Sequence, residues 1–203
     1  MPRTKPKPGP LLAFEGLDQS GKETQARALA EWLDARGFRV EIVGFPDYTT
    51  TIGREIGEAL RGERQFSAEV MQLLYVANRH EWKHAIETWL ADGRAVVCDR
   101  YLSSSVAYGE AQGLDPAWLV EIQRTLPPPT ITVLLDIAPE VAADRKRTNR
   151  DKFEQDLGML GRVRTSYLRQ AAEQDWVVVD ADRHVEVVAF DVIGRLGPRL
   201  GLS

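Results

Sequence analysis

The chain has 203 residues, a length that one domain with a sizeable core accounts for. Its 26 Lys and Arg against 30 Asp and Glu give a formal charge of -4, which argues against a broad basic face for duplex DNA or RNA. A small anionic substrate would need only a local basic pocket. The single cysteine, Cys98, excludes an intramolecular disulfide and is typical of a reducing compartment.

The first ten residues contain four prolines and three basic residues but no apolar stretch, which predicts a flexible tail and no signal peptide. Short β-rich runs then alternate with helical patterns, at residues 11–15, 39–45, 95–99, 130–136 and 176–180. Four runs are nearly continuous in Val, Leu and Ile, as in strands covered by helices on both faces. Residues 11–203 are therefore predicted to form one α/β domain with a five-stranded parallel sheet.

The longest helical pattern covers residues 67–91. Its apolar side chains recur at i, i+3 and i+4, which predicts that they face the core. These side chains are Val70, Leu73, Leu74, Ala77, Trp82, Ile86, Trp89 and Leu90. No apolar run reaches the roughly 20 residues of a membrane-spanning helix, so the expected protein is cytoplasmic, with no membrane partner.

A phosphate-binding loop is predicted where the first strand ends. Gly16 to Lys22 reads Gly-Leu-Asp-Gln-Ser-Gly-Lys, and a helical pattern from Thr24 to Arg36 follows, closed by Gly37. This strand, loop and helix context is that of the Walker A motif, whose backbone N–H groups and lysine bind nucleotide phosphates. The residues expected to bind ATP there are Gly16, Gln19, Ser20, Gly21, Lys22, Glu23 and Thr24.

The residue after Lys22 departs from this motif. The usual Ser or Thr, whose hydroxyl holds Mg²⁺, is replaced by Glu23. A carboxylate also suits Mg²⁺, directly or through water, although it would repel phosphate. We therefore expect Glu23 to position the metal, a role that an unchanged magnesium dependence in Glu23→Ala would contradict.

Several segments, taken in order, resemble the thymidylate kinases, which are P-loop nucleoside monophosphate kinases. The resemblance extends from Leu11 to about Asp182. The matching segments are Phe14 to Asp18, Gly21-Lys22, Thr24-Gln25, Phe45-Pro46, Ala77-Asn78-Arg79, Asp99-Arg100-Tyr101 with Ser104, Ser105 and Tyr108, and Asp151 to Glu154. The resemblance implies phosphoryl transfer from ATP to dTMP, with Mg²⁺, giving dTDP and ADP for dTTP synthesis. It also implies a homodimer and a short lid at about residues 144–153.

The resemblance implies roles around the sugar and phosphate of dTMP. Asp18 would accept a hydrogen bond from the 3′-hydroxyl, and Arg100 would bind the monophosphate through its planar guanidinium. Tyr108 would crowd the 2′ position and disfavour ribonucleotides. Phe45 and Tyr48 would line the pocket near the phosphate.

The resemblance also implies contacts to the thymine base. Arg79 would donate to the base, and the ring of Tyr75, one helical turn earlier, would stack on it. Either Ser104 or Ser105 would complete the polar contact. Periodicity alone would place Tyr75 in the core.

The remaining candidates surround the transferred phosphate. Gln19 occupies the loop position where certain relatives carry a catalytic arginine, so a cation from the lid is expected to neutralise charge in its place. The lid candidates are Arg145, Arg147, Arg150 and Lys152. The metal candidates are Glu23, Asp99 and Glu154, and Asp182 and Arg183 are expected near the adenine of ATP.

Three alternatives remain open from the sequence. His80-Glu81-Trp82-Lys83-His84 matches the H-E-x-x-H zinc-protease pattern on a predicted helix, but its third ligand is missing at the usual spacings. Glu23 is the only sign of a nucleotide-binding module without catalysis. Phosphorylation of another deoxynucleoside monophosphate is the nearest rival, since few contacts select the base.

Overall fold

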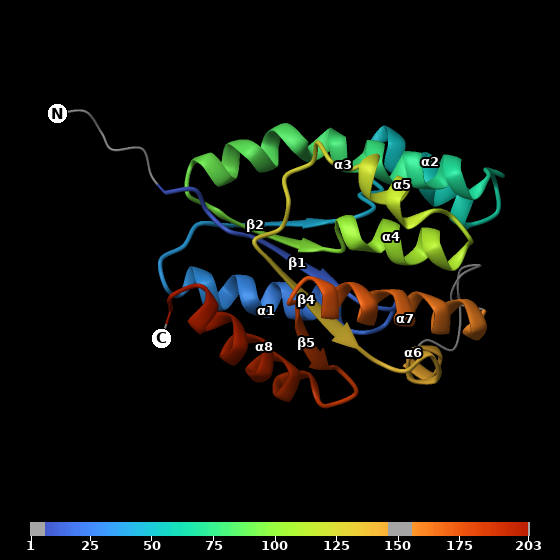
Figure 1. Ribbon diagram of the computed structural model, residues 1–203. Coiled ribbons are helices and arrows are strands. Elements are labelled where there is room, and N and C mark those ends of the chain that lie inside the picture. Colours follow the sequence, from blue (N-terminus) through green and yellow to red (C-terminus); the bar gives the residue numbers. More distant parts are fainter. Residues whose placement is uncertain (1–6, 146–155, 203) are drawn as a thin grey trace.

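The computed structural model describes residues 7–145 and 156–202 (Figure 1). One parallel sheet of five strands runs in the order β2-β3-β1-β4-β5. The strands are β1 (Leu11–Glu15), β2 (Val40–Gly44), β3 (Ala95–Asp99), β4 (Ile131–Asp136) and β5 (Val177–Asp180). The predicted five-stranded parallel sheet is confirmed, and each strand agrees with its expected range to within one residue at either end.

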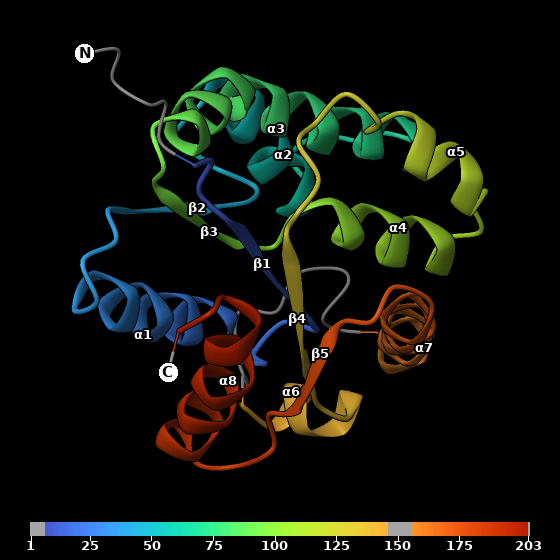
Figure 2. The same cartoon turned by 60° about the vertical axis from the view of Figure 1, so that its left-hand side comes forward.

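Helices cover both faces of the sheet (Figures 1 and 2). One face carries α1 (Lys22–Asp34) and α8 (Val185–Arg199). The other carries α3 (Ala68–Ala91), α4 (Leu102–Ala111) and α7 (Leu157–Glu173). The shorter helices pack against this second layer: α2 (Thr51–Leu60) on α3, α5 (Pro116–Glu121) on α4, and α6 (Pro139–Arg145) on α7.

The side chains of β1 show how one strand serves both layers. Leu12 and Phe14 belong to a cluster that contains Leu29 of α1, whereas Leu11 and Ala13 belong to a second cluster under α3. Because successive residues of a strand point to opposite faces, a strand buried on both sides is apolar at every position. This explains why the run was continuous and not alternating.

Cys98 fills a position in the second of these clusters. Its side chain is fully buried, and burial raises the pKa of its thiol well above the usual value. The one cysteine of the chain is therefore a core residue.

The first half of α3 corrects the expected core face. Ile86 is fully buried, as predicted, but Val70 and Leu73 are 39% and 47% exposed. The inward positions there include Gln72 and Arg79, both buried. Apolar periodicity misassigned this face because the part of the helix that faces a polar pocket carries polar side chains inward.

Two residues ahead of β1 are hydrogen-bonded to the rest of the protein. Residues 1–6 of the expected tail lie outside the described residues, but the N–H of Gly9 donates to the carbonyl of Leu90 at 2.8 Å. A Cβ at Gly9 would come within 1.8 Å of the carbonyl oxygen of Arg94, so only glycine fits this approach. The carbonyl of Pro10 accepts from Val96 at 2.9 Å. Gly9 therefore contacts the end of α3, and Pro10 contacts β3, directly ahead of β1.

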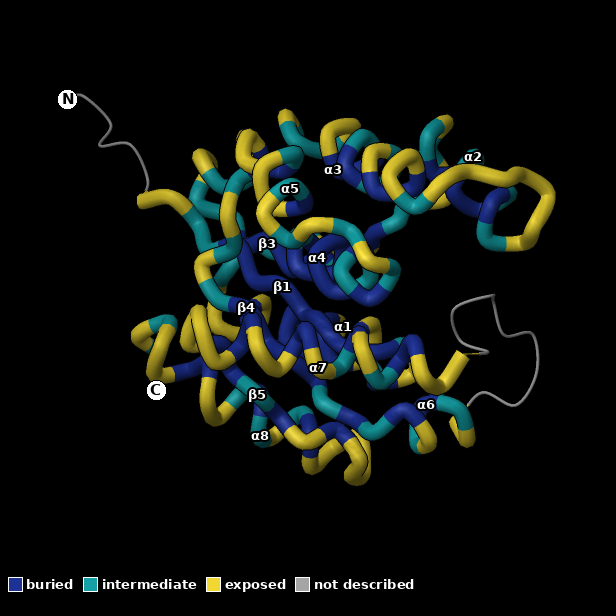
Figure 3. The backbone as a smooth tube through the Cα atoms, turned by 45° about the vertical axis from the view of Figure 1, so that its right-hand side comes forward, coloured by how far each residue is buried: buried dark blue, intermediate teal, exposed yellow. Residues whose placement is uncertain are grey.

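The topology places a crevice where the strands end. The connection through α1 carries the chain from β1 to β2 on one side, while β4 pairs on the other side of β1. In open parallel sheets, ligands bind at such a reversal, outside the carboxyl ends of the strands. Figure 3 shows that β1, β3 and β4 are buried over most of their length, so their carboxyl ends are rigidly held. In the described ranges, no helix is long and apolar enough to cross a membrane.

Candidate active site

The loop after β1 has the backbone of a phosphate cradle. Gly16 has φ 142°, and a Cβ there would lie 2.5 Å from the carbonyl oxygen of Leu135 on neighbouring β4. Gly21 has φ 89° and caps α1, which therefore begins at Lys22, two residues before the predicted start at Thr24. Both glycines hold conformations that L side chains rarely adopt, and the capped helix presents its free N–H groups to the crevice.

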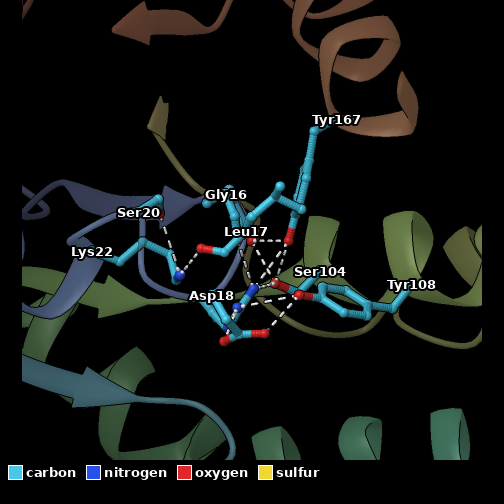
Figure 4. A network of polar contacts seen from close by, with 10 residues as sticks. Gly16, Leu17, Asp18, Ser20, Lys22, Ser104, Tyr108 and Tyr167 are labelled. Atoms are coloured by element: carbon cyan, nitrogen blue, oxygen red, sulfur yellow. Dashed lines mark hydrogen bonds and ion pairs between the residues drawn. The ribbon is translucent and has the colours of Figure 1, made fainter. Parts of the chain in front are cut away.

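Lys22 is folded into this loop. Its ammonium donates to the carbonyl of Leu17 at 2.7 Å and to Ser20 Oγ at 3.4 Å (Figure 4). Burial and, after it, the nearby positive charge of Arg100 lower the pKa of Lys22 from 10.5 to about 8, against the opposing effect of the surrounding carboxylates. Phosphate oxygens entering the loop would restore the charge balance around this amine.

Arg100 occupies the centre of the site from a strained position after β3. Its φ of 63° is left-handed, a conformation that costs a non-glycine residue about 1 kcal/mol or more. Its Nη2 donates to Asp18 Oδ1 at 2.6 Å, and its Nη1 donates to the carbonyl of Gly16 at 2.9 Å. The guanidinium is therefore fixed against the phosphate loop.

Asp18 is held as an ionised acceptor. Burial alone would raise its pKa, but Arg100 and then Lys22 outweigh this and hold the pKa of the carboxyl well below its usual value. Its Oδ2 accepts from the hydroxyl of Tyr108 at 3.0 Å. Burial raises the pKa of Tyr108, so this phenol stays protonated and can donate.

Arg79 marks the other end of the pocket. Its Nη1 donates to Ser105 Oγ at 2.8 Å and to Gln123 Oε1 at 3.1 Å. Its Nε is buried without a hydrogen-bond partner, and burial lowers the pKa of this guanidinium. One donor at this end is therefore unused.

The two serines left open by the sequence point to different ends. Ser105 contacts Arg79, whereas Ser104 Oγ accepts from Arg100 Nη1 at 3.2 Å. Successive residues of an α-helix differ by about 100° around the axis, so neighbours on α4 cannot face the same group.

A continuous cavity joins these two ends. Its lining residues come from the phosphate loop, the loop after β2, α2, α3 and α4: Asp18, Phe45, Pro46, Tyr48, Leu60, Gln72, Tyr75, Arg79, Arg100, Ser104, Ser105 and Tyr108. A wider cleft runs along the phosphate loop from Asp18 to Arg27 and past Asp99. Five residues line both hollows, Asp18, Phe45, Pro46, Tyr48 and Arg100, so two ligands placed in them would meet at Arg100.

Gln72 is a pocket residue that the sequence did not indicate. It is fully buried, and both its amide nitrogen and its amide oxygen lack a partner. A buried amide left unpaired costs about 1–3 kcal/mol. By comparison, Tyr48 is half exposed at the rim, and Phe45 is buried with its ring against Tyr101.

The two metal candidates among the described residues differ in their surroundings. Asp99 ends β3, and its buried Oδ1 has no hydrogen-bond partner. The side chain of Glu23 is 70% exposed, and its carboxylate lies 2.9 Å from Arg27 on the surface of α1. An unpaired buried carboxylate oxygen suits Mg²⁺, which takes one or two protein carboxylates and completes its shell with water and phosphate.

The H-E-x-x-H segment has other partners. Asn78 donates to Glu81 Oε2 at 2.9 Å, and His80 Nε2 lies 3.4 Å from Thr125 Oγ1. Within residues 7–145 and 156–202, no three His, Cys, Asp or Glu side chains are grouped so that they could hold a metal. Nothing in this part of the chain supplies the third ligand that a zinc protease requires.

Arg145 lies between the phosphate loop and the loop after β5, and Arg183 belongs to that second loop. Arg145, the last residue of α6, donates to the carbonyl of Gln19 at 3.1 Å and to that of Ala181 at 2.8 Å. Arg183 donates to Asp191 Oδ2 at 2.6 Å. Arg145 therefore ties the phosphate loop to the loop after β5. Three further predicted residues, Arg147, Arg150 and Glu154, lie outside the described residues, as does Lys152.

Besides Gln72, two further buried residues of the site were missed by sequence reasoning. Glu15, the last residue of β1, accepts from Ser104 Oγ at 2.6 Å and from the N–H of Tyr101 at 2.9 Å. The hydroxyl of Tyr167, on α7, lies 3.2 Å from Arg100 Nη1. A charged residue ending an apolar strand was a usable signal for Glu15. Tyr167 gave none, because a tyrosine on an amphipathic helix is indistinguishable from a core residue.

Known proteins are similar to this chain in sequence and in fold. The family model for thymidylate kinase matches residues 14–192. The chain is 34% identical to a thymidylate kinase of Plasmodium falciparum over 92% of this chain and 89% of that protein. It is 32% identical to one of Schizosaccharomyces pombe over 91% of this chain and 90% of that protein. The solved thymidylate kinase of Candida albicans superposes with a TM-score of 0.84 at 27% identity, covering 95% and 92% of the two chains.

Proposed function

Because the chain belongs to the thymidylate kinase family and transfers a phosphoryl group from ATP to dTMP, we propose that Arg100 holds the acceptor phosphate at the junction of the two hollows. The observation that carries this proposal is the position of its guanidinium, which lines both cavities and is fixed to the phosphate loop. A planar guanidinium offers paired donors to phosphate oxygens.

In this arrangement the pocket reads the acceptor nucleotide from phosphate to base. The ionised Asp18 accepts a hydrogen bond from the 3′-hydroxyl, and Tyr108 beside it narrows the space around the sugar. Arg79 reaches the base with its unused Nε donor, Ser105 holds that guanidinium, and Tyr75 covers the base from the pocket wall. A base that accepts a hydrogen bond would give the unpaired Nε of Arg79 a partner, and this favours binding of such a base.

The donor phosphates lie along the loop from Gly16 to Thr24, at the N-terminus of α1. Transfer between two phosphates depends mainly on alignment and on neutralising charge. Lys22 and Arg100 supply two cations from opposite sides of the loop. Arg145 holds the backbone of the same loop and positions it, while charge neutralisation by Arg147 and Arg150 stays a prediction.

Mg²⁺ would be held by Asp99, whose unpaired Oδ1 fits it, together with the phosphates of the bound nucleotides. When bound, the ion neutralises charge on the phosphates. The exposed carboxylate of Glu23, already paired with Arg27, is a weaker candidate.

A homodimer is the assembly that we propose. The apolar side chains of Phe66, Val70 and Leu73 are exposed on or beside the first half of α3, and exposed apolar patches commonly mark protein interfaces. Sedimentation equilibrium of the purified chain tests this. The cytoplasmic location also stays a proposal, supported by the single reduced cysteine.

The activity itself is tested with a panel of acceptors. Purified protein is incubated with ATP and Mg²⁺, and dTMP, dUMP, dGMP, dCMP and AMP are offered separately while diphosphate formation is measured. We expect dTMP to be the preferred acceptor. Preference for another deoxynucleotide would support the rival kinase, and no turnover with any acceptor would support a binding module.

The lowered pKa of Lys22 makes ATP capture dependent on pH. In the free protein Lys22 is charged below a pKa of about 8 and neutral above it. At dTMP concentrations far below its KM, where ATP meets the free enzyme, we expect kcat/KM for ATP to fall about tenfold per pH unit above this pKa, because kcat/KM then reports the free enzyme. The fall in kcat should begin at higher pH, since bound phosphate favours the charged amine.

The matched variant is Lys22→Arg, whose guanidinium does not titrate in this range. Its kcat/KM for ATP should show no alkaline fall, whatever its absolute level. An identical fall in the variant would assign the titration to another group.

A further inference from the structure

Tyr167 lies behind the phosphate-binding arginine, on the side away from the pocket. It comes from α7, a helix that otherwise packs against α4, α6 and β4, and it is 1% exposed. Its hydroxyl contacts three groups: Arg100 Nη1 at 3.2 Å, Ser104 Oγ at 2.8 Å and Glu15 Oε2 at 3.3 Å (Figure 4). Tyr167 does not line either hollow in the described part of the chain.

The hydrogen bonds of this group form a chain with one donor-to-acceptor direction. The guanidinium of Arg100 can only donate, and the carboxylate of Glu15 only accepts. Ser104 donates to Glu15 Oε2 at 2.6 Å, so the hydroxyl of Tyr167 accepts from Arg100 and donates towards Ser104 or Glu15. The chain of donors therefore starts at Arg100 and ends at a fully buried carboxylate at the end of β1.

This arrangement limits where the guanidinium can go. Asp18, which holds Nη2 at 2.6 Å, lies on the pocket side and is itself a ligand group for the sugar. Gly16 and Ser104 also accept from Nη1, at 2.9 and 3.2 Å, and the hydroxyl of Tyr167 adds a third acceptor to this nitrogen. A guanidinium whose orientation is fixed in advance loses less side-chain entropy on binding and therefore binds phosphate more tightly.

We propose that Tyr167 is a positioning residue for dTMP. Its phenol hydroxyl, anchored by Ser104 and Glu15, fixes Arg100 in the orientation that receives the 5′-phosphate. This inference rests on the proposed role of Arg100. It makes a specific demand on ligands: the contribution of Tyr167 exists only for a ligand that carries a phosphate. Thymidine has the same base and sugar without that group, so its binding should not depend on the Tyr167 hydroxyl.

The test compares dTMP and thymidine affinities, measured by calorimetry on the full chain, in Tyr167→Phe and Tyr101→Phe. Tyr101 is an equally buried tyrosine, but its hydroxyl donates to the carbonyl of Pro127 at 3.1 Å. We expect Tyr167→Phe to weaken dTMP about five- to tenfold, the loss of one hydrogen bond in a charged network, and to leave thymidine unchanged. Tyr101→Phe should leave both affinities unchanged.

Two results would overturn the inference: unchanged dTMP affinity in Tyr167→Phe, or an equal loss for dTMP and thymidine, which would indicate a structural role alone. If Tyr167→Phe does not fold, Tyr167→Met fills the buried site without a hydroxyl and should give the same phosphate-selective loss. Equal effects on both ligands in that variant would also reject it. Failure of the proposed role of Arg100 looks different, because Arg100→Lys would then leave the affinity for dTMP unchanged.

Discussion

Arg100→Lys is expected to lower kcat/KM for dTMP by about 100-fold or more, because two charge-assisted hydrogen bonds to phosphate are lost and each contributes roughly 1.5–3 kcal/mol. A lysine keeps the positive charge but replaces the planar fork by a single ammonium. It cannot reach Asp18 and Gly16 together, as the guanidinium does at 2.6 and 2.9 Å.

Steady-state kinetics with dTMP varied at saturating ATP measure this loss. Arg94→Lys is the matched control, since Arg94 is also partly buried and pairs with Glu41 at 2.7 Å. Arg94 precedes β3, however, and so lies at the opposite, amino end of the strands. It should retain near wild-type kinetics. A loss below tenfold in Arg100→Lys would mean that the phosphate is held elsewhere.

Lys22→Met is expected to lower kcat by about 10³-fold while it stabilises the free protein. The catalytic loss follows because one preorganised charge at the transferred phosphate is removed, which typically costs 10²–10³-fold or more. The gain in stability follows because the charged amine is buried in the absence of nucleotide.

The sign of the stability effect depends on pH. A lysine whose pKa falls from 10.5 when unfolded to about 8 when folded is destabilising while it is charged in both states, below about pH 8. The free energy of unfolding of Lys22→Met should therefore exceed that of the wild type by about 1–2 kcal/mol at pH 7, and the difference should shrink as pH rises from 8 to 10.5. Urea unfolding of both proteins at pH 7 and 9.5 measures it.

Lys83→Met provides the comparison, because Lys83 pairs with Glu87 on the surface of α3. Lys83→Met should change neither kcat nor the pH dependence of the free energy of unfolding. Were Lys22→Met to lose activity and stability together, the loss of activity would reflect a damaged loop.

The sheet was predictable because its three central strands, β1, β3 and β4, are buried on both faces. Leu11 to Phe14 and Ala95 to Cys98 carry apolar side chains at every position, so no competing pattern obscured them. The phosphate loop was also predictable, since its glycines and lysine have fixed spacing and a fixed context. Together these placed the crevice before any side chain was located.

The acceptor pocket was harder to predict, because its polar side chains come from helices. Gln72 and Arg79 are buried on α3, where helical periodicity expects apolar residues, and Val70 and Leu73 took their place in the prediction. Periodicity measures the contrast between core and solvent, and a polar cavity inside the protein reverses that contrast. The same limitation concealed Tyr167, whose hydroxyl is its only functional atom.

The burial of Cys98 has a practical consequence for solution measurements. A thiol reacts as its thiolate and requires access by the reagent, and Cys98 has no exposed surface and a raised pKa. A cysteine introduced at an exposed position such as Phe190 of α8, which is 79% exposed, would therefore be the one thiol that maleimide dyes modify. Site-specific fluorescent labelling of the folded enzyme needs no prior removal of the native cysteine.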